Sequence, residues 1–228
     1  RHDLEKNPHE EELAARIDSF ELAYRMPTAA PEALDLAKEP EHLKELYGLN
    51  VGKSKHFATQ CMMARRLVER GTRFIQIYSG GMANQRSWDG HNDIKGNHTG
   101  FAQETDQPIA GLLSDLEQRG LLDETLIVWA GEFGRLPVAQ KSGKPGRDHN
   151  PHCFTAWMAG GGVKGGVSHG ESDEVGHKAA VDKVHVNDFH ATILHLLGLN
   201  HKELTYRYGG RDFRLTDVAG KVIAPILA

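Results

Sequence analysis

The sequence predicts an α/β fold, a mainly parallel sheet with helices on both faces, preceded by a helical segment. Two observations lead to this prediction. Helical patterns fill the chain up to Gly71, and apolar strand patterns alternate with helical patterns after it. Strands that are separated by helices pair in parallel. We therefore expect a helical arm at residues 1–71 and the carboxyl-terminal portion of an α/β domain at residues 72–228.

Three helices are predicted in the arm. The first starts at Asn7-Pro8, a cap followed by a first-turn proline, and stops before Pro27. The second is a short piece between Pro31 and Pro40. The third runs from about residue 53 to 70, with apolar side chains on one side and Gly71 as its stop. These helices are predicted to be scaffolding.

Strands and helices alternate in the second part. Its predicted elements, in order, are a strand at 72–78, a helix at 99–119, strands at 126–130 and 153–158, and a helix at 187–197. Gly120 and Gly198 follow the two helices as stops. In a parallel sheet, ligands bind beyond the carboxyl ends of the strands, so the polar loops there are the expected site.

Composition narrows the class of protein. The chain has 27 basic and 31 acidic residues, a net charge of -4, and no basic stripe, so a nucleic-acid partner is not expected. No apolar run approaches a membrane span, and the first residues lack a signal peptide's apolar core. Since no initiator methionine is present, we expect a fragment or subunit of a larger protein or assembly. Cys61 and Cys153 lack the spacing of a thiolate site and are expected to be buried thiols.

Three polar loops carry candidate metal ligands. Aspartate, glutamate and histidine are the donors that divalent ions such as zinc, manganese or calcium accept. The loop at 146–152 concentrates a carboxylate and two imidazoles just before an apolar strand. Together the loops predict a site for one or two ions, with these candidate ligands: Asp89, His91, Glu132, Asp148, His149 and His152.

Each candidate has an alternative role. Asp89 could cap a turn, and His91 could be a surface residue. Glu132 could form an ion pair with Arg135 or Arg147, whereas those two guanidinium groups could instead hold a substrate's sulfate or phosphate oxygens. The 146–152 loop has the weakest alternative, because a turn explains Asp148 but not both histidines. The glycine run 160–166 lacks P-loop spacing and predicts a tight connection.

The stretch 74–217 resembles the DUF1501 family, sulfatase-like proteins of the alkaline phosphatase superfamily. Four motifs carry the resemblance: Trp88-Asp89-Gly90-His91, the run 123–126 leading into Gly131-Glu132-Phe133-Gly134-Arg135, the run 146–152, and the run 159–166. The resemblance implies an alkaline phosphatase-like fold. It also implies that Asp89 and His91 match an upstream ligand pair and that His149 or His152 matches a downstream ligand.

The chain departs from the superfamily in two places. Phe133 stands where the superfamily has a metal-binding histidine, so the resemblance does not imply a complete site for a second ion. The superfamily's nucleophile is implied to lie upstream of Arg1, and Ser79 is at best a weak substitute for it. The family's frequent twin-arginine signal implies export to the bacterial periplasm or envelope.

Two functions are consistent with these residues. The first is a metal-dependent hydrolase of sulfate or phosphate esters, acting on a small-molecule or glycan ester with a nucleophile not present in this chain. The alternative is a non-catalytic scaffold or binding subunit with a degenerate alkaline phosphatase-like site. A metalloprotease is weaker, because no His-Glu-x-x-His pattern occurs.

Overall fold

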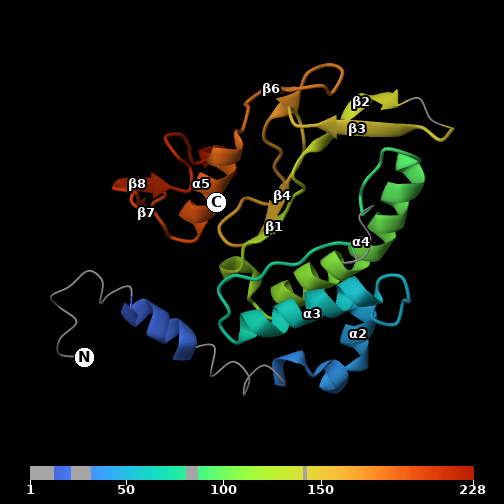
Figure 1. The fold of residues 1–228 in the computed structure, drawn as a ribbon. Coiled ribbons are helices and arrows are strands. Elements are labelled where there is room, and N and C mark those ends of the chain that lie inside the picture. The colour runs from blue at the N-terminus through green and yellow to red at the C-terminus, as the bar shows by residue number, and fades with distance from the viewer. Residues whose placement is uncertain (1–12, 22–31, 81–86, 141–142) are drawn as a thin grey trace. The chain divides into compact units, whose positions relative to one another are not determined.

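The computed structural model describes four stretches of the chain, residues 13–21, 32–80, 87–140 and 143–228. They form two compact units (Figure 1). Unit 1 takes in the described residues up to Ile77 together with Gln107–Leu112, and unit 2 holds the remaining described residues. The expected division after residue 71 stays a prediction.

Unit 1 is helical. Residues 13–21 are helical, while the remainder of the first predicted helix lies outside the described residues. The next elements are the 3-10 helix η1 and the α-helices α2 and α3, which span Leu36–Lys38, Glu41–Tyr47 and Lys55–Glu69. The α3 bounds confirm the helix predicted at 53–70, and its side chains Ala58, Cys61 and Met62 are fully buried. The apolar spacing of α3 therefore faces the core of unit 1, as helical periodicity requires.

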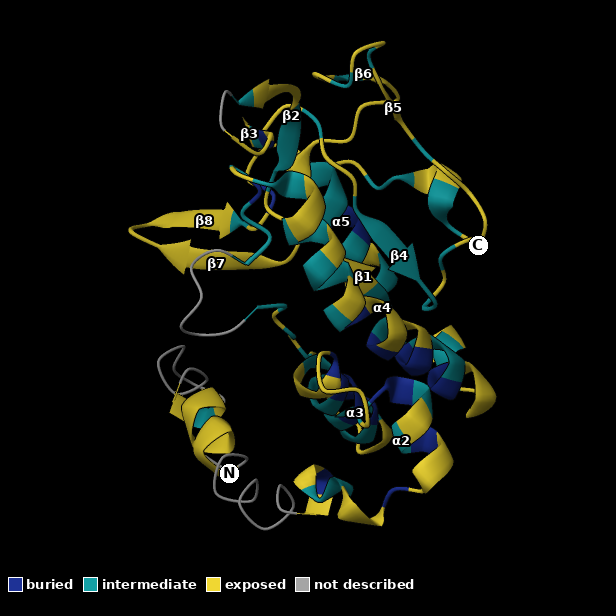
Figure 2. Ribbon diagram, turned by 90° about the vertical axis from the view of Figure 1, so that its right-hand side faces the viewer, coloured by how far each residue is buried: buried dark blue, intermediate teal, exposed yellow. Residues whose placement is uncertain are grey.

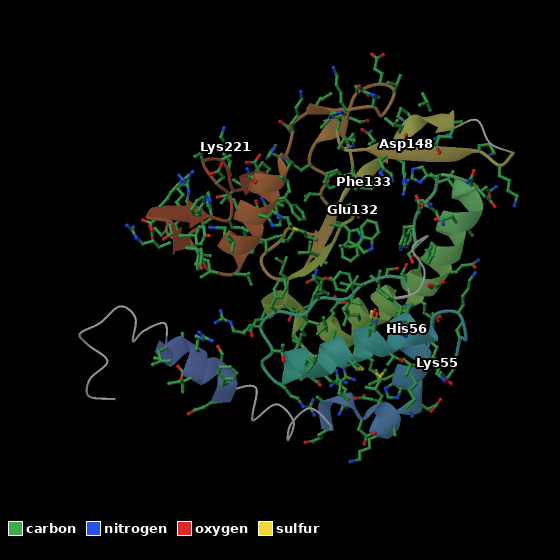
Figure 3. The ribbon with its side chains drawn as sticks, viewed as in Figure 1. Lys55, His56, Glu132, Phe133, Asp148 and Lys221 are labelled. Atoms are coloured by element: carbon green, nitrogen blue, oxygen red, sulfur yellow. The ribbon has the colours of Figure 1, made fainter. Side chains whose placement is uncertain are left out.

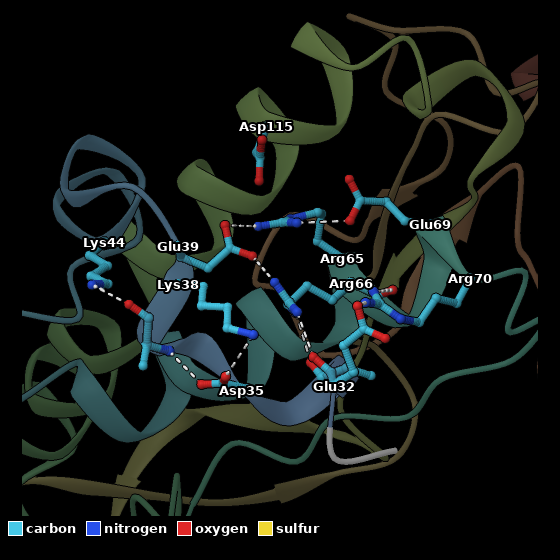
Figure 4. A network of polar contacts seen from close by, with 12 residues as sticks. Glu32, Asp35, Lys38, Glu39, Lys44, Arg65, Arg66, Glu69, Arg70 and Asp115 are labelled. Carbon is cyan, nitrogen blue, oxygen red and sulfur yellow. Dashed lines mark hydrogen bonds and ion pairs between the residues drawn. The ribbon is translucent and has the colours of Figure 1, made fainter. Parts of the chain in front are cut away.

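A buried ion-pair network joins α3 to the residues before α2 (Figure 4). Arg65 donates to Glu39 at 2.7 Å and to Glu69 at 2.8 Å, and Arg66 also pairs with Glu39. The side chains of Arg65 and Glu39 are only 2% and 5% exposed. Arg66 further donates to the backbone carbonyls of Ala33 and Glu32. The network thus fastens the segment around η1 to α3.

The strands of unit 2 form four separate two-stranded antiparallel sheets, and the predicted parallel sheet is wrong. β1 (Ile127–Trp129) pairs with β4 (Trp157–Ala159), so the strand predicted at 126–130 is confirmed. The other pairs are β2 with β3 (Gly134–Gln140 and Gly146–Asn150), β5 with β6 (Glu171–Ser172 and Ala179–Val181), and β7 with β8 (Thr205–Tyr208 and Arg211–Arg214).

The connection between β1 and β4 explains why the two strands are antiparallel. This connection contains the β2–β3 hairpin and no helix, so the chain returns antiparallel to β1 rather than crossing over (Figure 1). Trp129 stands opposite Trp157, with parallel rings 6.4 Å apart. The predicted strand at 72–78 is also wrong, because this described segment has no regular secondary structure and pairs with no strand. The predicted strand at 153–158 begins only at Trp157.

Both helices predicted after residue 72 are confirmed. α4 spans Ile94–Gln118 and begins before the predicted residue 99 because the Asp93 carboxylate caps it, accepting from the Gly96 amide at 3.2 Å. α5 spans Val186–Leu196 and starts with a capping box between His185 and Asp188. Over the part of the chain that the structure describes, no helix is both long and apolar enough to cross a membrane.

The residues of the β7–β8 hairpin are almost all exposed (Figure 2). Tyr206 and Tyr208 are each 70% exposed, and Phe213, opposite Tyr206 in the register, is 40% exposed. Arg211 lies over the Phe213 ring, 4.7 Å from its centroid. The hairpin therefore carries an exposed aromatic face, which we call the hairpin face.

The two cysteines differ in burial. Cys61 in α3 is fully buried, and burial raises the pKa of its thiol to about 12, whereas Cys153 is half-buried. Since the thiolate is the reactive form, we expect Cys61 to resist a thiol reagent in the folded protein. At pH 8, Ellman's reagent should therefore label Cys153 within minutes and Cys61 only in denaturant. Rapid labelling of Cys61 in the native Cys153→Ser variant would contradict the burial.

Candidate metal centre

The loop that carries Asp89 and His91 lies along the start of β3. The Arg147 amide donates to the Gly90 carbonyl at 2.8 Å. Gly146 approaches the same loop so closely that a Cβ atom on it would stand 1.8 Å from the His91 carbonyl oxygen. Only a residue without a side chain fits there. The backbone of β3 thus sets where Asp89 and His91 stand.

Three of the predicted ligands converge. Asp89, His91 and His149 each offer a donor atom, and these atoms all lie within 4.8 Å of one another. Donor atoms on a tetrahedral zinc ion stand about 3.4 Å apart, since each bond is about 2.1 Å long. The residues therefore fit one ion after a movement of about an ångström. One carboxylate and two imidazoles suit zinc, manganese or iron better than calcium, which prefers oxygen donors.

Hydrogen bonds connect this donor cluster to its surroundings. His91 Nδ1 contacts the Asp89 carboxylate, and His91 Nε2 lies 3.3 Å from Asp148 Oδ1. The Asp148 carboxylate also accepts from the His149 amide at 2.7 Å. Arg135 donates to the Trp88 carbonyl at 3.0 Å and reaches Asp89 Oδ1 at 3.4 Å. The cluster is thus a connected polar network at a site that is partly open to solvent.

Phe133 supports His149. It lies in the loop between β1 and β2, next to Glu132, whereas Asp148 lies on β3 (Figure 3). The Phe133 ring is 4.0 Å from the His149 ring, centroid to centroid, with a tilt of 30°. The ring of His149 is in turn 4.7 Å from the ring of His91. Phe133 therefore covers one face of His149 and acts here as a packing residue.

Both carboxylates beside His91 are stabilised as anions. Partial burial tends to raise the pKa of Asp89, but the hydrogen bond from His91 and the charges of His91 and Arg135 outweigh it and lower the pKa below 3.8. The amide of His149, followed by the hydrogen bond from His91, lowers the pKa of Asp148. At neutral pH both groups therefore carry the negative charge that a cation requires.

The other three predicted ligands, Glu132, Asp148 and His152, stand outside this cluster. Glu132 is exposed and is not among the three convergent donors. His152 lies in the turn after β3, where its amide donates to Asn150 Oδ1 at 3.1 Å and its ring lies 6.3 Å from that of His177. Metal binding by Glu132 or His152 stays a prediction.

The two candidate anion-binding arginines have different surroundings. The Arg135 guanidinium donates to two backbone carbonyls and pairs with Asp89, and its side chain is 18% exposed. Within the described stretches, Arg147 makes one side-chain hydrogen bond, to the Gly146 carbonyl at 3.0 Å. Neither arginine forms an ion pair with Glu132 among the described residues. Arg135 therefore holds the loop, and Arg147 has donors left for a ligand.

Comparison with known proteins identifies the family. The model of the family described as "Protein of unknown function (DUF1501)" matches residues 1–227. The chain belongs to the DUF1501 family. No curated protein and no solved structure matches it. The convergence of Asp89, His91 and His149 is therefore known from the structure of this chain itself.

Two residues of the DUF1501 motifs have roles that no local sequence pattern indicates. Gly146 opens the motif at 146–152, and its role is the close approach to His91. Phe133 packs on the ring of His149. Glycine is required at position 146 because a Cβ there would clash with the backbone of His91. This requirement is visible only once the two segments, far apart in the chain, are placed together.

Proposed function

We propose that this DUF1501 protein is a metal-dependent hydrolase of sulfate or phosphate esters. One observation carries the proposal: the donor atoms of Asp89, His91 and His149 lie within 4.8 Å of one another. Two segments far apart in the chain supply them, and His91 links the segments, because one ring nitrogen contacts Asp89 and the other lies 3.3 Å from Asp148 Oδ1. One carboxylate and two imidazoles suit a zinc, manganese or iron ion, and these three donors would hold a single ion.

The roles of the residues follow from their positions. Asp89, His91 and His149 would hold the ion, which when bound supplies Lewis-acid polarisation of an ester oxygen and an acidic bound water. Arg147 and His149 lie two residues apart in β3 and share a face of the strand. The Arg147 guanidinium would there bind the sulfate or phosphate oxygens of the substrate. Arg135 keeps the ligand loop in place through the Trp88 carbonyl.

The resemblance to the alkaline phosphatase superfamily supports the class of reaction. Sulfate and phosphate esters have tetrahedral oxyanion groups, which a cation and a guanidinium together stabilise as charge builds up. Ser79 is a poor nucleophile candidate in this arrangement, because its hydroxyl accepts from the Trp88 indole at 2.8 Å. Export to a bacterial periplasm or envelope belongs to the same proposal, since it rests on the same resemblance.

Metal analysis and ester hydrolysis test the proposal together. The full-length protein, purified without chelator, should carry about one transition-metal ion per chain and hydrolyse aryl sulfates or aryl phosphates. The double variant Asp89→Ala/His149→Ala should lose the ion. Its turnover should fall by about 100-fold or more, because the ion's contribution to the transition state is several kcal/mol.

His56→Ala is the matched control. His56 is an exposed histidine of α3 in unit 1 and takes no part in the donor cluster (Figure 3). This variant should keep the ion content and turnover of the parent protein. A parent protein that carries no stoichiometric ion, and gains none on addition of zinc or manganese, would refute the metal site.

The hairpin face favours a second candidate function, a non-catalytic binding subunit. Tyr206 and Tyr208 are each 70% exposed and lie with Phe213 on one face of the hairpin, and a contiguous exposed apolar patch is typical of an interaction site. A binding subunit would retain the ion as a structural element and hydrolyse none of the esters. Stoichiometric metal without any turnover of the full-length protein is therefore the result that supports this function over the first.

A further inference from the structure

The two carboxylates near His91 contact opposite nitrogens of its ring. Asp89 contacts Nδ1, and Asp148 Oδ1 lies 3.3 Å from Nε2. A metal ion can take only the lone pair of one of these nitrogens, because the other must then carry the ring's proton. One carboxylate is therefore on the metal side of His91, and the other accepts a hydrogen bond from the far side.

The arrangement of the donors favours the Nδ1 side of His91 for the ion, because Asp89 contacts that nitrogen. Asp89 belongs to the cluster whose donor atoms lie within 4.8 Å of one another, and Asp148 does not. An ion on the Nε2 side would need Asp148 and His149 to converge with His91. Over the described residues, those three form no such cluster. The Asp148 carboxylate accepts instead from the backbone amide of His149, at 2.7 Å.

We infer that Asp148 is a positioning residue, not a ligand: it accepts the Nε2 hydrogen of His91 and so presents Nδ1 to the metal beside Asp89. This inference rests on the proposed metal site. Metal-binding histidines commonly donate their other ring hydrogen to a carboxylate, which fixes the tautomer and the ring orientation. His91 Nδ1 and the Asp89 carboxylate would then hold the ion together, while the ring hydrogen stays on Nε2.

The place of Asp148 on β3 suits it to accept the Nε2 hydrogen of His91. Its hydrogen bond from the next residue's amide holds the carboxylate against the strand, so it can meet His91 without ordering a long flexible side chain. The same strand carries His149, which is one of the ligands. The strand β3 thus carries the ligand His149 itself, and through Asp148 it also orients the ligand His91.

Zinc titration of three variants tests the inference on the full chain. Asp148→Asn keeps an oxygen that can accept from Nε2, so zinc should still bind at one ion per chain, with an affinity lower by no more than about 10-fold. Asp148→Ala should also keep the stoichiometry, with an affinity lower by about 10–100-fold, the usual effect of losing an outer-shell partner. Asp89→Ala should lose stoichiometric binding.

A spectroscopic measurement gives a readout that does not depend on activity. In the zinc-loaded protein labelled with nitrogen-15 histidine, the ring of His91 should show a protonated Nε2 and a metal-bound Nδ1, assigned by comparison with His91→Gln. Asp173→Asn is the matched control, because Asp173 accepts from the His177 amide in a turn of its own and makes no contact with His91. Its zinc affinity and the His91 signals should be unchanged.

The outcomes separate the inference from the proposed function. If the parent protein binds no zinc, the proposed metal site fails and the inference fails with it. If the parent binds zinc but Asp148→Ala loses the ion as completely as Asp89→Ala, or if His91 proves to be protonated at Nδ1, only the inference is overturned. Retained stoichiometry in both Asp148 variants with a protonated Nε2 supports it. Circular dichroism of each variant shows whether it has folded.

Discussion

Replacing Glu39 with alanine is expected to destabilise the protein by about 3–5 kcal/mol, the cost of removing one partner from a buried ion pair. Glu39 is the shared acceptor of Arg65 and Arg66, and its side chain is 5% exposed. Without it, the Arg65 guanidinium, 2% exposed, keeps its charge in a site that water scarcely reaches. Urea unfolding followed by circular dichroism at pH 7 measures this loss.

The neighbouring residue Glu41 supplies the control. It is an exposed carboxylate that accepts from Asn50 at 3.0 Å and pairs with Lys44 at the surface. Because water solvates both partners after truncation, Glu41→Ala should shift the unfolding midpoint far less than Glu39→Ala. Equal shifts for the two variants would show that the Glu39 network adds nothing beyond surface pairing.

Acid should weaken the same network. Burial tends to raise the pKa of Glu39, but the hydrogen bonds and charges of Arg65 and Arg66 outweigh it, so the pKa in the folded protein lies below 4.5. A carboxyl whose pKa is lowered on folding stabilises the protein fully above its unfolded pKa and loses this contribution as the pH falls through its folded pKa. Below pH 4.5, the stability of the parent should therefore approach that of Glu39→Ala.

Gly146→Ala is expected to disrupt the metal centre without touching a ligand. The added Cβ would stand 1.8 Å from the His91 carbonyl oxygen and 2.1 Å from its carbonyl carbon. Both are backbone atoms that no rotamer change can move away. The loop must shift, and it should then lose the hydrogen bond from the Arg147 amide to Gly90. We expect zinc affinity to fall by about 10–100-fold or more and stability by about 1–3 kcal/mol.

Gly143→Ala isolates the steric effect. A Cβ on Gly143 would meet no atom within 4 Å, so this variant should bind zinc and unfold like the parent. Hydrogen exchange at the Arg147 amide gives a readout that needs no metal. This amide should exchange faster in Gly146→Ala and at the parent rate in Gly143→Ala. Slow exchange and full zinc affinity in Gly146→Ala would mean that the loop does not lie against β3 in solution.

The helices were predictable because their determinants are local. α3 and α5 were expected from apolar spacing and from the glycines that follow them, and the structure confirms both. The start of α4 was misplaced, since the cap is Asp93 and not a residue beside Thr99. A capping carboxylate is a local feature too, but it lies here in the same polar loop as the predicted metal ligand Asp89.

The sheets were not predictable to the same degree. β3 (Gly146–Asn150) contains no apolar side chain, so it carries no strand periodicity, and its pairing with β2 depends on contacts between distant residues. The alternation of strands and helices favoured a parallel sheet. The β2–β3 hairpin between β1 and β4 reverses the chain instead, and makes their pairing antiparallel.

For this DUF1501 protein, residue types and short spacings are enough to predict the chemical groups that are present, the positions of the main helices and the family. They do not predict that Asp89 and His91 meet His149, or that Asp148 faces the other nitrogen of His91. These meetings depend on backbone contacts between β3 and a loop nearly sixty residues earlier, and such contacts leave no periodic pattern in the sequence.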